Sequence, residues 1–157
     1  MKYLVEADLL IVNGLHLETP TEDLAKANMK KGARVLRLGD NTIGQKEWVF
    51  DFSFPEEDGN PNPHLWLNVA YAMKYAELTR DALSQLDPAH KADYEANTKL
   101  YLAKLDALDK GIMEAMKTIP PKNRKLLTYH DSFAYFCPRY GCTVIGAIQP
   151  SDFSHPS

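Results

Sequence analysis

The sequence predicts an α/β protein in which two small lobes are joined by one long helix. A strand, a helix and a second strand follow one another between residues 7 and 38, which is the spacing of a parallel βαβ unit. Residues 88–118 then carry apolar side chains at helical spacing, and a helix of that length measures about 45 Å. Such a helix is too long for one small lobe, so we expect it to bridge two. A second strand–helix–strand pattern follows between residues 125 and 148.

The composition is that of an ordinary globular protein. Of the 157 residues, 45% are hydrophobic and 25% are charged. The net charge of −3, without any long basic run, gives no reason to expect a nucleic-acid partner. No stretch approaches the roughly 18 consecutive apolar residues of a membrane span, and the N-terminus lacks the features of a signal peptide. Taken literally this indicates a cytosolic protein; the alternative is a mature or cut piece of a longer chain.

The first lobe begins with an apolar run. Residues 7–13 are closed by a glycine and predict a strand buried on both faces. A helix is expected from Thr21, which two acidic residues follow, to the Lys-Lys-Gly run at 30–32. The second strand of the unit is predicted at 34–38.

A long loop and a helix complete this lobe. Residues 40–63 are rich in Gly, Pro, Asn and acidic side chains, and a loop of this length is usually functional or mobile. Residues 48–52 could form a brief extended piece within it. A helix is predicted at 65–86, and Asp87 and Pro88 then end it and begin the long helix, as its N-cap and first helical residue.

The second lobe starts after the long helix ends near Thr118. We predict a strand at 125–129, a helix at 131–140 that Pro138 should fray or kink, and a strand at 142–148. The tail at 149–157 resembles a link to a further segment, so the lobe is expected to be truncated. The predicted organisation is a partial amino-terminal lobe, a linking helix and the start of a carboxy-terminal lobe: residues 1–87, 88–119 and 120–157.

Cys137 and Cys142 are the only cysteines, and their spacing is not that of a Cys-x-x-Cys motif. The favoured interpretation is two half-buried thiols that flank a helix-to-strand turn. The alternative is a local disulfide, which would require an oxidising compartment.

Two histidines carry the strongest functional signal. A proline-stiffened arm at residues 60–63 leads to His64 at the start of a helical segment, and His130 ends a predicted strand just before another helix. A helix N-terminus disfavours the imidazolium, and a metal ligand must be a neutral imidazole. We therefore predict one shared metal site at the carboxyl ends of these segments, with Asp131 as a hydrogen-bonding partner of His130. The alternative is that each histidine is a satisfied polar residue at an element boundary.

The other histidines are weaker candidates. His16 follows the first strand and could reach a cleft, but a structural turn is favoured. His90 lies among charged neighbours in the first turn of the long helix and is expected to be solvated. His155 lies in the tail without informative neighbours. The acidic run at 56–58 predicts a solvated loop that could raise the local concentration of cations.

Three stretches together resemble one known family. They are Ala-Asp-Leu-Leu-Ile-Val-Asn-Gly-Leu-His-Leu-Glu at 7–18, Asn-Pro-His-Leu-Trp-Leu-Asn at 62–68 and Tyr-His-Asp-Ser-Phe-Ala-Tyr-Phe at 129–136. The sequence resembles, over nearly its whole length and in the same order, the metal-binding lipoproteins and periplasmic proteins that feed zinc and manganese ABC importers.

The resemblance implies two Rossmann-like α/β lobes joined by a long rigid helix, with the metal held between them. His64 falls on the histidine of the family's Pro-His-x-Trp motif. His130 falls on a position that is histidine in zinc-type members and glutamate in many manganese-type members, which favours Zn²⁺ over Mn²⁺. His16 falls outside the family's ligand set. The first family ligand lies upstream of the strand at Leu9 and the last lies beyond Ser157, so the resemblance implies a fragment.

The function implied is an extracytoplasmic solute-binding protein that captures a divalent transition metal and passes it to an ABC permease, without making or breaking a bond. The full-length protein is then expected in the periplasm or lipid-anchored at the cell surface. Two alternatives remain: a metal-dependent hydrolase, although no His-Glu-x-x-His motif is present, and a metal-free adhesin or scaffold. An unfinished sheet edge in an incomplete lobe could also pair with a second copy of the chain.

Overall fold

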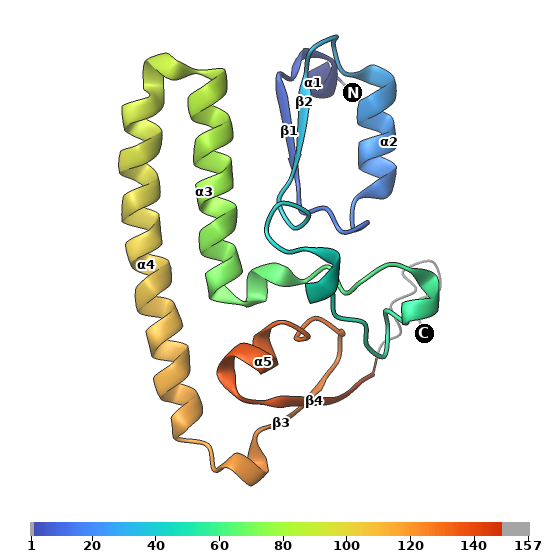
Figure 1. The fold of residues 1–157 in the computed structure, drawn as a ribbon, viewed down its shortest axis with the longest axis vertical. Coiled ribbons are helices and arrows are strands. Elements are labelled where there is room, and N and C mark those ends of the chain that lie inside the picture. The colour runs from blue at the N-terminus through green and yellow to red at the C-terminus, as the bar shows by residue number, and fades with distance from the viewer. Residues whose placement is uncertain (1, 149–157) are drawn as a thin grey trace.

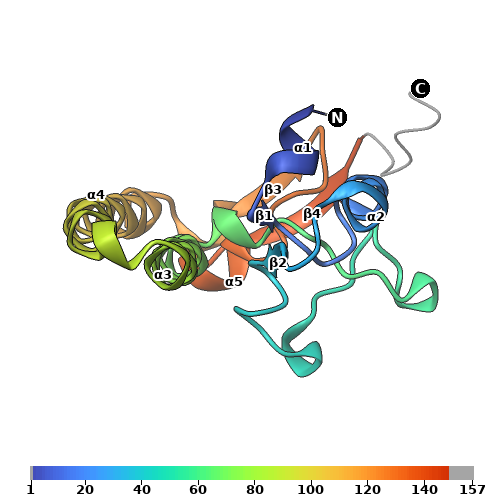
Figure 2. The same cartoon turned by 90° about the horizontal axis from the view of Figure 1, so that it is seen from above.

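The computed structural model describes residues 2–148, so the tail at 149–157 and its His155 lie outside the described part of the chain. Two strands pair in parallel near the amino terminus, from Leu9 with Arg34 to Val12 with Arg37. Figures 1 and 2 show a helix on one side of this pair and a helical hairpin on the other. The elements of this unit are α1 (Lys2–Glu6), β1 (Leu9–Val12), α2 (Thr19–Asn28) and β2 (Arg34–Arg37).

The hairpin consists of α3 (Val69–Leu86) and α4 (Lys91–Lys117). A 3-10 turn at Pro88–His90 separates them, so α4 begins three residues later than predicted. With 27 residues, α4 is about 40 Å long and extends past α3 to the lower unit in Figure 1. It contacts α3 and the short helix α5 (Phe136–Tyr140) through a hydrophobic cluster centred on Val69, Leu105 and Tyr140.

The lower unit contains a second parallel pair, β3 (Lys125–Thr128) and β4 (Thr143–Ala147), whose register shifts between Leu126 and Leu127. The helix between them, α5, spans only Phe136–Tyr140. The prediction of a helix from residue 131 is therefore wrong. The Asp131 carboxylate and the Tyr135 hydroxyl accept hydrogen bonds from the backbone of the 40–63 loop, and residues 131–135 are not helical.

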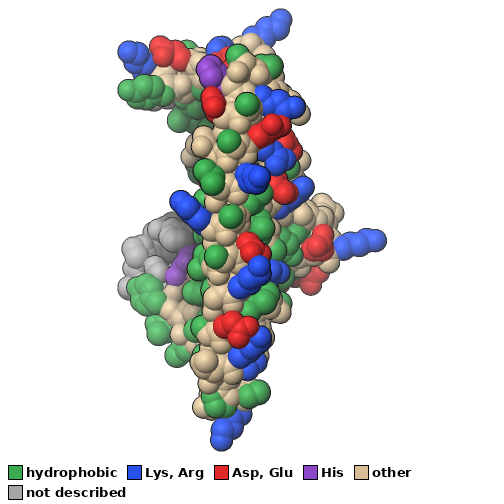
Figure 3. All heavy atoms as spheres, turned by 90° about the vertical axis from the view of Figure 1, so that its left-hand side faces the viewer, with side chains coloured by type: hydrophobic (Ala, Val, Ile, Leu, Met, Phe, Trp, Pro, Cys, Tyr) green, Lys and Arg blue, Asp and Glu red, His purple; other side chains and the backbone are tan. Residues whose placement is uncertain are grey.

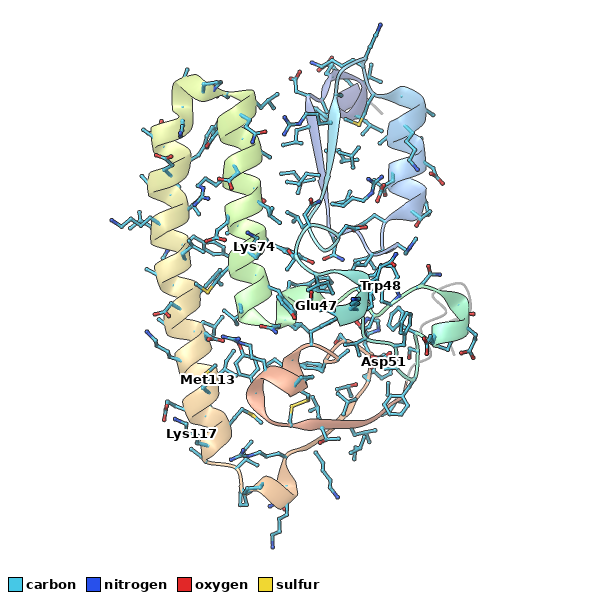
Figure 4. All side chains as sticks on the ribbon, in the orientation of Figure 1. Glu47, Trp48, Asp51, Lys74, Met113 and Lys117 are labelled. Carbon is cyan, nitrogen blue, oxygen red and sulfur yellow. A yellow bond between two sulfur atoms is a disulfide. The ribbon has the colours of Figure 1, made fainter. Side chains whose placement is uncertain are left out.

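The prediction of free thiols is also wrong, because Cys137 and Cys142 form a disulfide. The left-handed Gly141 ends α5 and turns the chain back, so that the two cysteines lie next to each other. The bond closes the turn between α5 and β4, and it is visible beside α5 in Figure 4.

Two further boundaries differ from the sequence prediction. Residues Leu65–Leu67 form a 3-10 turn, and α3 begins only at Val69, where the Asn68 side chain caps it by accepting from the Ala70 amide. Residues 48–52 form no strand; the loop instead closes through one isolated bridge between Asp51 and Phe54.

The outer face of α4 is solvated. Figure 3 shows basic and acidic side chains alternating along it, and three of its ion pairs join residues three or four positions apart. Exposed pairs of this kind contribute little to stability, because water screens them. Within residues 2–148, no helix has both the length and the apolar character needed to cross a membrane.

A partly buried ion pair ties α4 to α5. The Arg139 guanidinium donates to both carboxylate oxygens of Asp109, at 2.7 and 2.5 Å, and the Tyr140 hydroxyl donates to Asp109 Oδ1 at 2.6 Å. These contacts, led by the Arg139 hydrogen bonds, lower the pKa of Asp109 below its ordinary value of 3.8. The pair fixes the lower unit against the long helix.

Replacing Asp109 by asparagine should therefore destabilise the protein in a pH-dependent way. Because the folded-state pKa is lowered, the carboxylate contributes stability above its ordinary pKa, and this contribution is lost as the pH falls through the folded-state value. At pH 6 the variant should lose about 2 kcal/mol of unfolding free energy, since Arg139 keeps a partly exposed but unpaired charge. Urea unfolding of both proteins at pH 6, 4 and 2 should show the difference shrinking with acid; a constant difference would contradict this role for Asp109.

Candidate metal centre

The arm that carries His64 is fixed from several sides. The backbone N–H of Asn62 donates to the Val49 carbonyl at 2.9 Å, and the side-chain nitrogen Nδ2 of Asn13 donates to the Pro63 carbonyl at 2.9 Å. Asn13 is itself held by the Tyr75 hydroxyl, which donates to its Oδ1. Proline in the arm reduces the entropy lost on ordering it. The backbone before His64 is therefore anchored both to the end of β1 and to the 40–63 loop.

One side chain determines the tautomer of His64. Asn62 Oδ1 lies 2.8 Å from His64 Nδ1 and also accepts from the His64 backbone amide at 3.0 Å. Because this oxygen can only accept, Nδ1 carries the proton and Nε2 presents its lone pair. The orientation of the Asn62 amide follows from its nitrogen, which faces two acceptors, Asp51 Oδ2 and the Asp131 carbonyl.

The other ring nitrogen of His64, Nε2, faces His130, the second predicted ligand. His130 Nε2 lies 3.0 Å from His64 Nε2, and the two rings meet edge to face with their centroids 4.8 Å apart. A tetrahedral zinc ion bonded to both nitrogens would hold them about 3.3 Å apart. The structure thus brings together two imidazoles from positions 66 residues apart, at nearly the spacing that a shared ion requires.

Burial keeps His64 neutral. The ring packs between Phe54 and Trp66, with centroids at 6.0 and 5.1 Å, and only 7% of the residue is exposed. Burial, followed by the neighbouring His130, lowers the pKa of His64 to about 4. The prediction that helix N-termini keep both imidazoles neutral is wrong. His64 precedes only a 3-10 turn, and α5 begins six residues after His130.

Two carboxylates lie behind the imidazole pair. Asp131 is almost fully buried, and its Oδ2 accepts from the Ser53 amide at 3.0 Å. Asp51, labelled in Figure 4 beside the lower unit, accepts a hydrogen bond from Asn62 Nδ2 at 2.8 Å. Burial, followed by the nearby Asp131, raises the pKa of Asp51 to about 7. That Asp131 also orients His130 stays a prediction.

The remaining histidines are not part of the pair. His16 is exposed, in left-handed backbone with φ of 66°, and it lines a hollow of about 260 Å³ with Asp58 and with Phe54, which also contacts His64. His90 is exposed and bonded to Asp87. Among residues 2–148, no cluster of three or more His, Cys, Asp or Glu side chains could hold a metal. The pair His64 and His130 thus offers two ligands.

Sequence reasoning missed the residues that position the pair. Asn62 and Asn13 hold the His64 arm, while Asp51 lies behind it, and Tyr135 accepts from the Val49 amide. The proline-flanked position of Asn62 was the only signal in the sequence, since a polar residue in a rigid arm needs fixed partners when it is buried. The other contacts join segments distant in sequence.

Two imidazoles that converge on one point are a donor set found in metal-binding proteins with histidine ligands. The comparison with protein families is specific: the model described as "Zinc-uptake complex component A periplasmic" matches residues 1–157. The chain belongs to this family. The family consists of binding components of transport systems rather than of enzymes.

Curated relatives agree with this assignment. The chain is 32% identical over 135 residues to the metal ABC transporter substrate-binding lipoprotein ScbA of Streptococcus cristatus, covering 86% of this chain and 44% of that protein. It is also 32% identical over 135 residues to the iron-binding protein YfeA of Yersinia pestis, covering 86% of this chain and 41% of that protein. The chain therefore spans less than half the length of these relatives.

Solved structures show the same fold. The periplasmic zinc-binding protein TroA of Treponema pallidum superposes with a TM-score of 0.81 at 26% identity, over 98% of this chain and 54% of that one. A manganese-bound periplasmic metal-binding protein from Candidatus Liberibacter asiaticus gives a TM-score of 0.79 at 29% identity, over 97% and 53%. The α/β fold class predicted from the sequence is confirmed as that of periplasmic metal-binding proteins, of which this chain covers about half.

Proposed function

We propose that this chain contributes His64 and His130 to the metal site of an extracytoplasmic solute-binding protein, which captures a divalent transition metal and delivers it to an ABC permease. The observation that supports this most directly is the approach of the two Nε2 atoms to 3.0 Å, with the His64 tautomer already set by Asn62. The metal is cargo: it is bound and released, and no bond of a substrate is broken.

We infer three parts that serve this function. Residues 1–87 form part of one lobe and deliver His64; residues 88–119 form the linking helix; and residues 120–157 begin a second lobe that delivers His130. One hydrophobic cluster supports a joint role of the first and third parts, because it combines residues of both: Leu15, Ile43, Leu65, Ala134 and Tyr135.

The preferred cargo in this proposal is Zn²⁺, with Mn²⁺ as the alternative. Imidazole nitrogen suits zinc, and a given nitrogen site binds Zn²⁺ more tightly than Mn²⁺ in the usual order of affinities. The names of relatives include zinc, manganese and iron, so they support a divalent metal without choosing among them.

The disulfide between Cys137 and Cys142 supports an extracytoplasmic location. Structural disulfides persist in oxidising compartments such as the periplasm or the cell surface and are rare in the cytosol. This agrees with relatives described as lipoproteins and periplasmic proteins. We therefore place the intact protein outside the cytoplasm, in the periplasm or lipid-anchored at the surface.

Titration of the intact protein with Zn²⁺ and with Mn²⁺ by calorimetry tests the proposal. We expect one ion per protein, with Zn²⁺ bound more tightly, and no hydrolysis of ester or peptide substrates by the loaded protein. Turnover that requires the bound metal would instead establish the hydrolase alternative, which membership in a transport family does not favour. Absence of binding for both ions would leave the metal-free adhesin or scaffold.

We also propose that the chain can associate with a second copy. Within residues 2–148, each sheet has only two strands, so each pair leaves strand edges without a further strand. Sedimentation velocity of the chain should then show a concentration-dependent dimer; a monomer at all concentrations would contradict this.

A further inference from the structure

Asn62 is the most completely engaged polar side chain of the site. It is fully buried, and its amide makes four hydrogen bonds. The oxygen accepts from the backbone and the ring of His64, and the nitrogen donates to Asp51 Oδ2 at 2.8 Å and to the Asp131 carbonyl at 3.1 Å. The oxygen therefore accepts two hydrogen bonds and the nitrogen donates both of its hydrogens.

These four contacts reach both halves of the site. The oxygen side holds the ring of His64, which fixes the proton on Nδ1 and directs Nε2 toward His130. The nitrogen side holds the backbone carbonyl of the residue that follows His130 in the chain. A single side chain therefore sets the tautomer of one imidazole and the position of the loop that carries the other.

We propose that Asn62 is a positioning residue for metal capture, which sets metal affinity through the tautomer of His64 and the distance between the two imidazole-bearing segments. This inference rests on the proposed function, because it assumes that both histidines bind the cargo. It adds a residue that touches no metal but holds both ligands in binding geometry. Partners that orient a ligating histidine typically change metal affinity by about 10- to 100-fold when they are removed.

The chemistry of the position requires an amide. A carboxylate could accept from His64 Nδ1 but has no hydrogen to give to Asp51 or to the Asp131 carbonyl, and it would add a third acid to this buried region. A hydroxyl offers one donor for two acceptors. Only an amide side chain of this length satisfies the two acceptors on one side and the two donors on the other.

The test compares Asn62→Ala with the matched control Asn60→Ala in the intact protein. Asn60 lies in the same arm, two residues earlier, and is exposed. Zn²⁺ affinity is measured by competition with a chromophoric chelator. We expect Asn62→Ala to bind Zn²⁺ about 10- to 100-fold more weakly and Asn60→Ala to bind it within about twofold of the unmodified protein. Equal affinity in Asn62→Ala and the unmodified protein would overturn the inference.

A second measurement does not depend on the variant folding well. Two-bond ¹⁵N–¹H correlation spectra of the unmodified, metal-free protein report which nitrogen of His64 carries the proton. We expect the Nδ1–H tautomer, and in Asn62→Ala a mixture of both tautomers. An Nε2–H tautomer in the unmodified protein would overturn the inference even if Asn62→Ala does not fold.

The variant His64→Ala separates this inference from the proposed function. If His64→Ala binds Zn²⁺ as tightly as the unmodified protein, the proposed function fails. If His64→Ala loses affinity while Asn62→Ala retains both its affinity and the His64 tautomer, only the positioning role of Asn62 fails.

Discussion

Replacing His64 by alanine is expected to weaken Zn²⁺ binding to the intact protein by about 100-fold or more. The change removes one of the two imidazoles that converge on the site, and His130 would be left without its partner nitrogen at 3.0 Å. Four-ligand zinc sites bind with roughly 10–16 kcal/mol, which amounts to about 3 kcal/mol for each ligand and hence about 100-fold in affinity. Competition with a chelator of known affinity measures the loss.

Two further variants make this result interpretable. His130→Ala should lose affinity to a similar extent, because His130 Nε2 lies 3.0 Å from His64 Nε2 and is proposed to bind the same ion. His16→Ala is the matched control: this histidine is exposed and is not one of the two proposed ligands, so its removal should leave the affinity unchanged. Unaltered affinity in His64→Ala, or equal losses in all three variants, would contradict the assignment of the site.

Replacing Leu65 by alanine should cost about 3 kcal/mol of unfolding free energy. Leu65 has no exposed surface and packs in the cluster that joins the first strand's turn to the second lobe. Truncation of a buried leucine removes its favourable transfer from water and leaves a cavity, at a cost of about 2–5 kcal/mol. Urea unfolding followed by circular dichroism in metal-free buffer measures the effect without a contribution from ligand binding.

Leu100→Ala provides the comparison for this loss. Leu100 lies on α4 with 66% of its surface exposed, so the same chemical change should alter stability by less than about 0.5 kcal/mol. A loss below about 1 kcal/mol for Leu65→Ala would show that the segment after His64 is not part of the cooperative core.

Local sequence patterns were sufficient for most of the fold. The strands at Leu9–Val12 and Arg34–Arg37 and the helices α3 and α4 lie close to their predicted positions, because apolar period and end signals determine them within one segment. The pairing of His64 with His130 was also predictable, since restricted backbone led to both histidines at the ends of their segments.

The features that the sequence did not predict depend on contacts between distant segments rather than on local patterns. Residues 131–135 have a helical start signal, yet Asp131 and Tyr135 accept from backbone amides about 80 residues away, and these long-range bonds compete with helix formation. The disulfide depends on how Gly141 turns the chain, which spacing alone does not reveal. The role proposed for Asn62 depends on four hydrogen bonds to three residues, His64, Asp51 and Asp131. Contacts of this kind arise only when the tertiary structure forms.

The contact between His64 and Trp66 gives the protein an optical signal of its own. The indole lies 5.1 Å from an imidazole that is buried and neutral, and only one other tryptophan, Trp48, is present in the sequence. An ion that binds to His64 brings a positive charge close to this indole, and its field is poorly screened beside a buried ring. The emission of Trp66 should therefore change when cargo arrives, so that capture could be followed in real time by fluorescence without any attached dye.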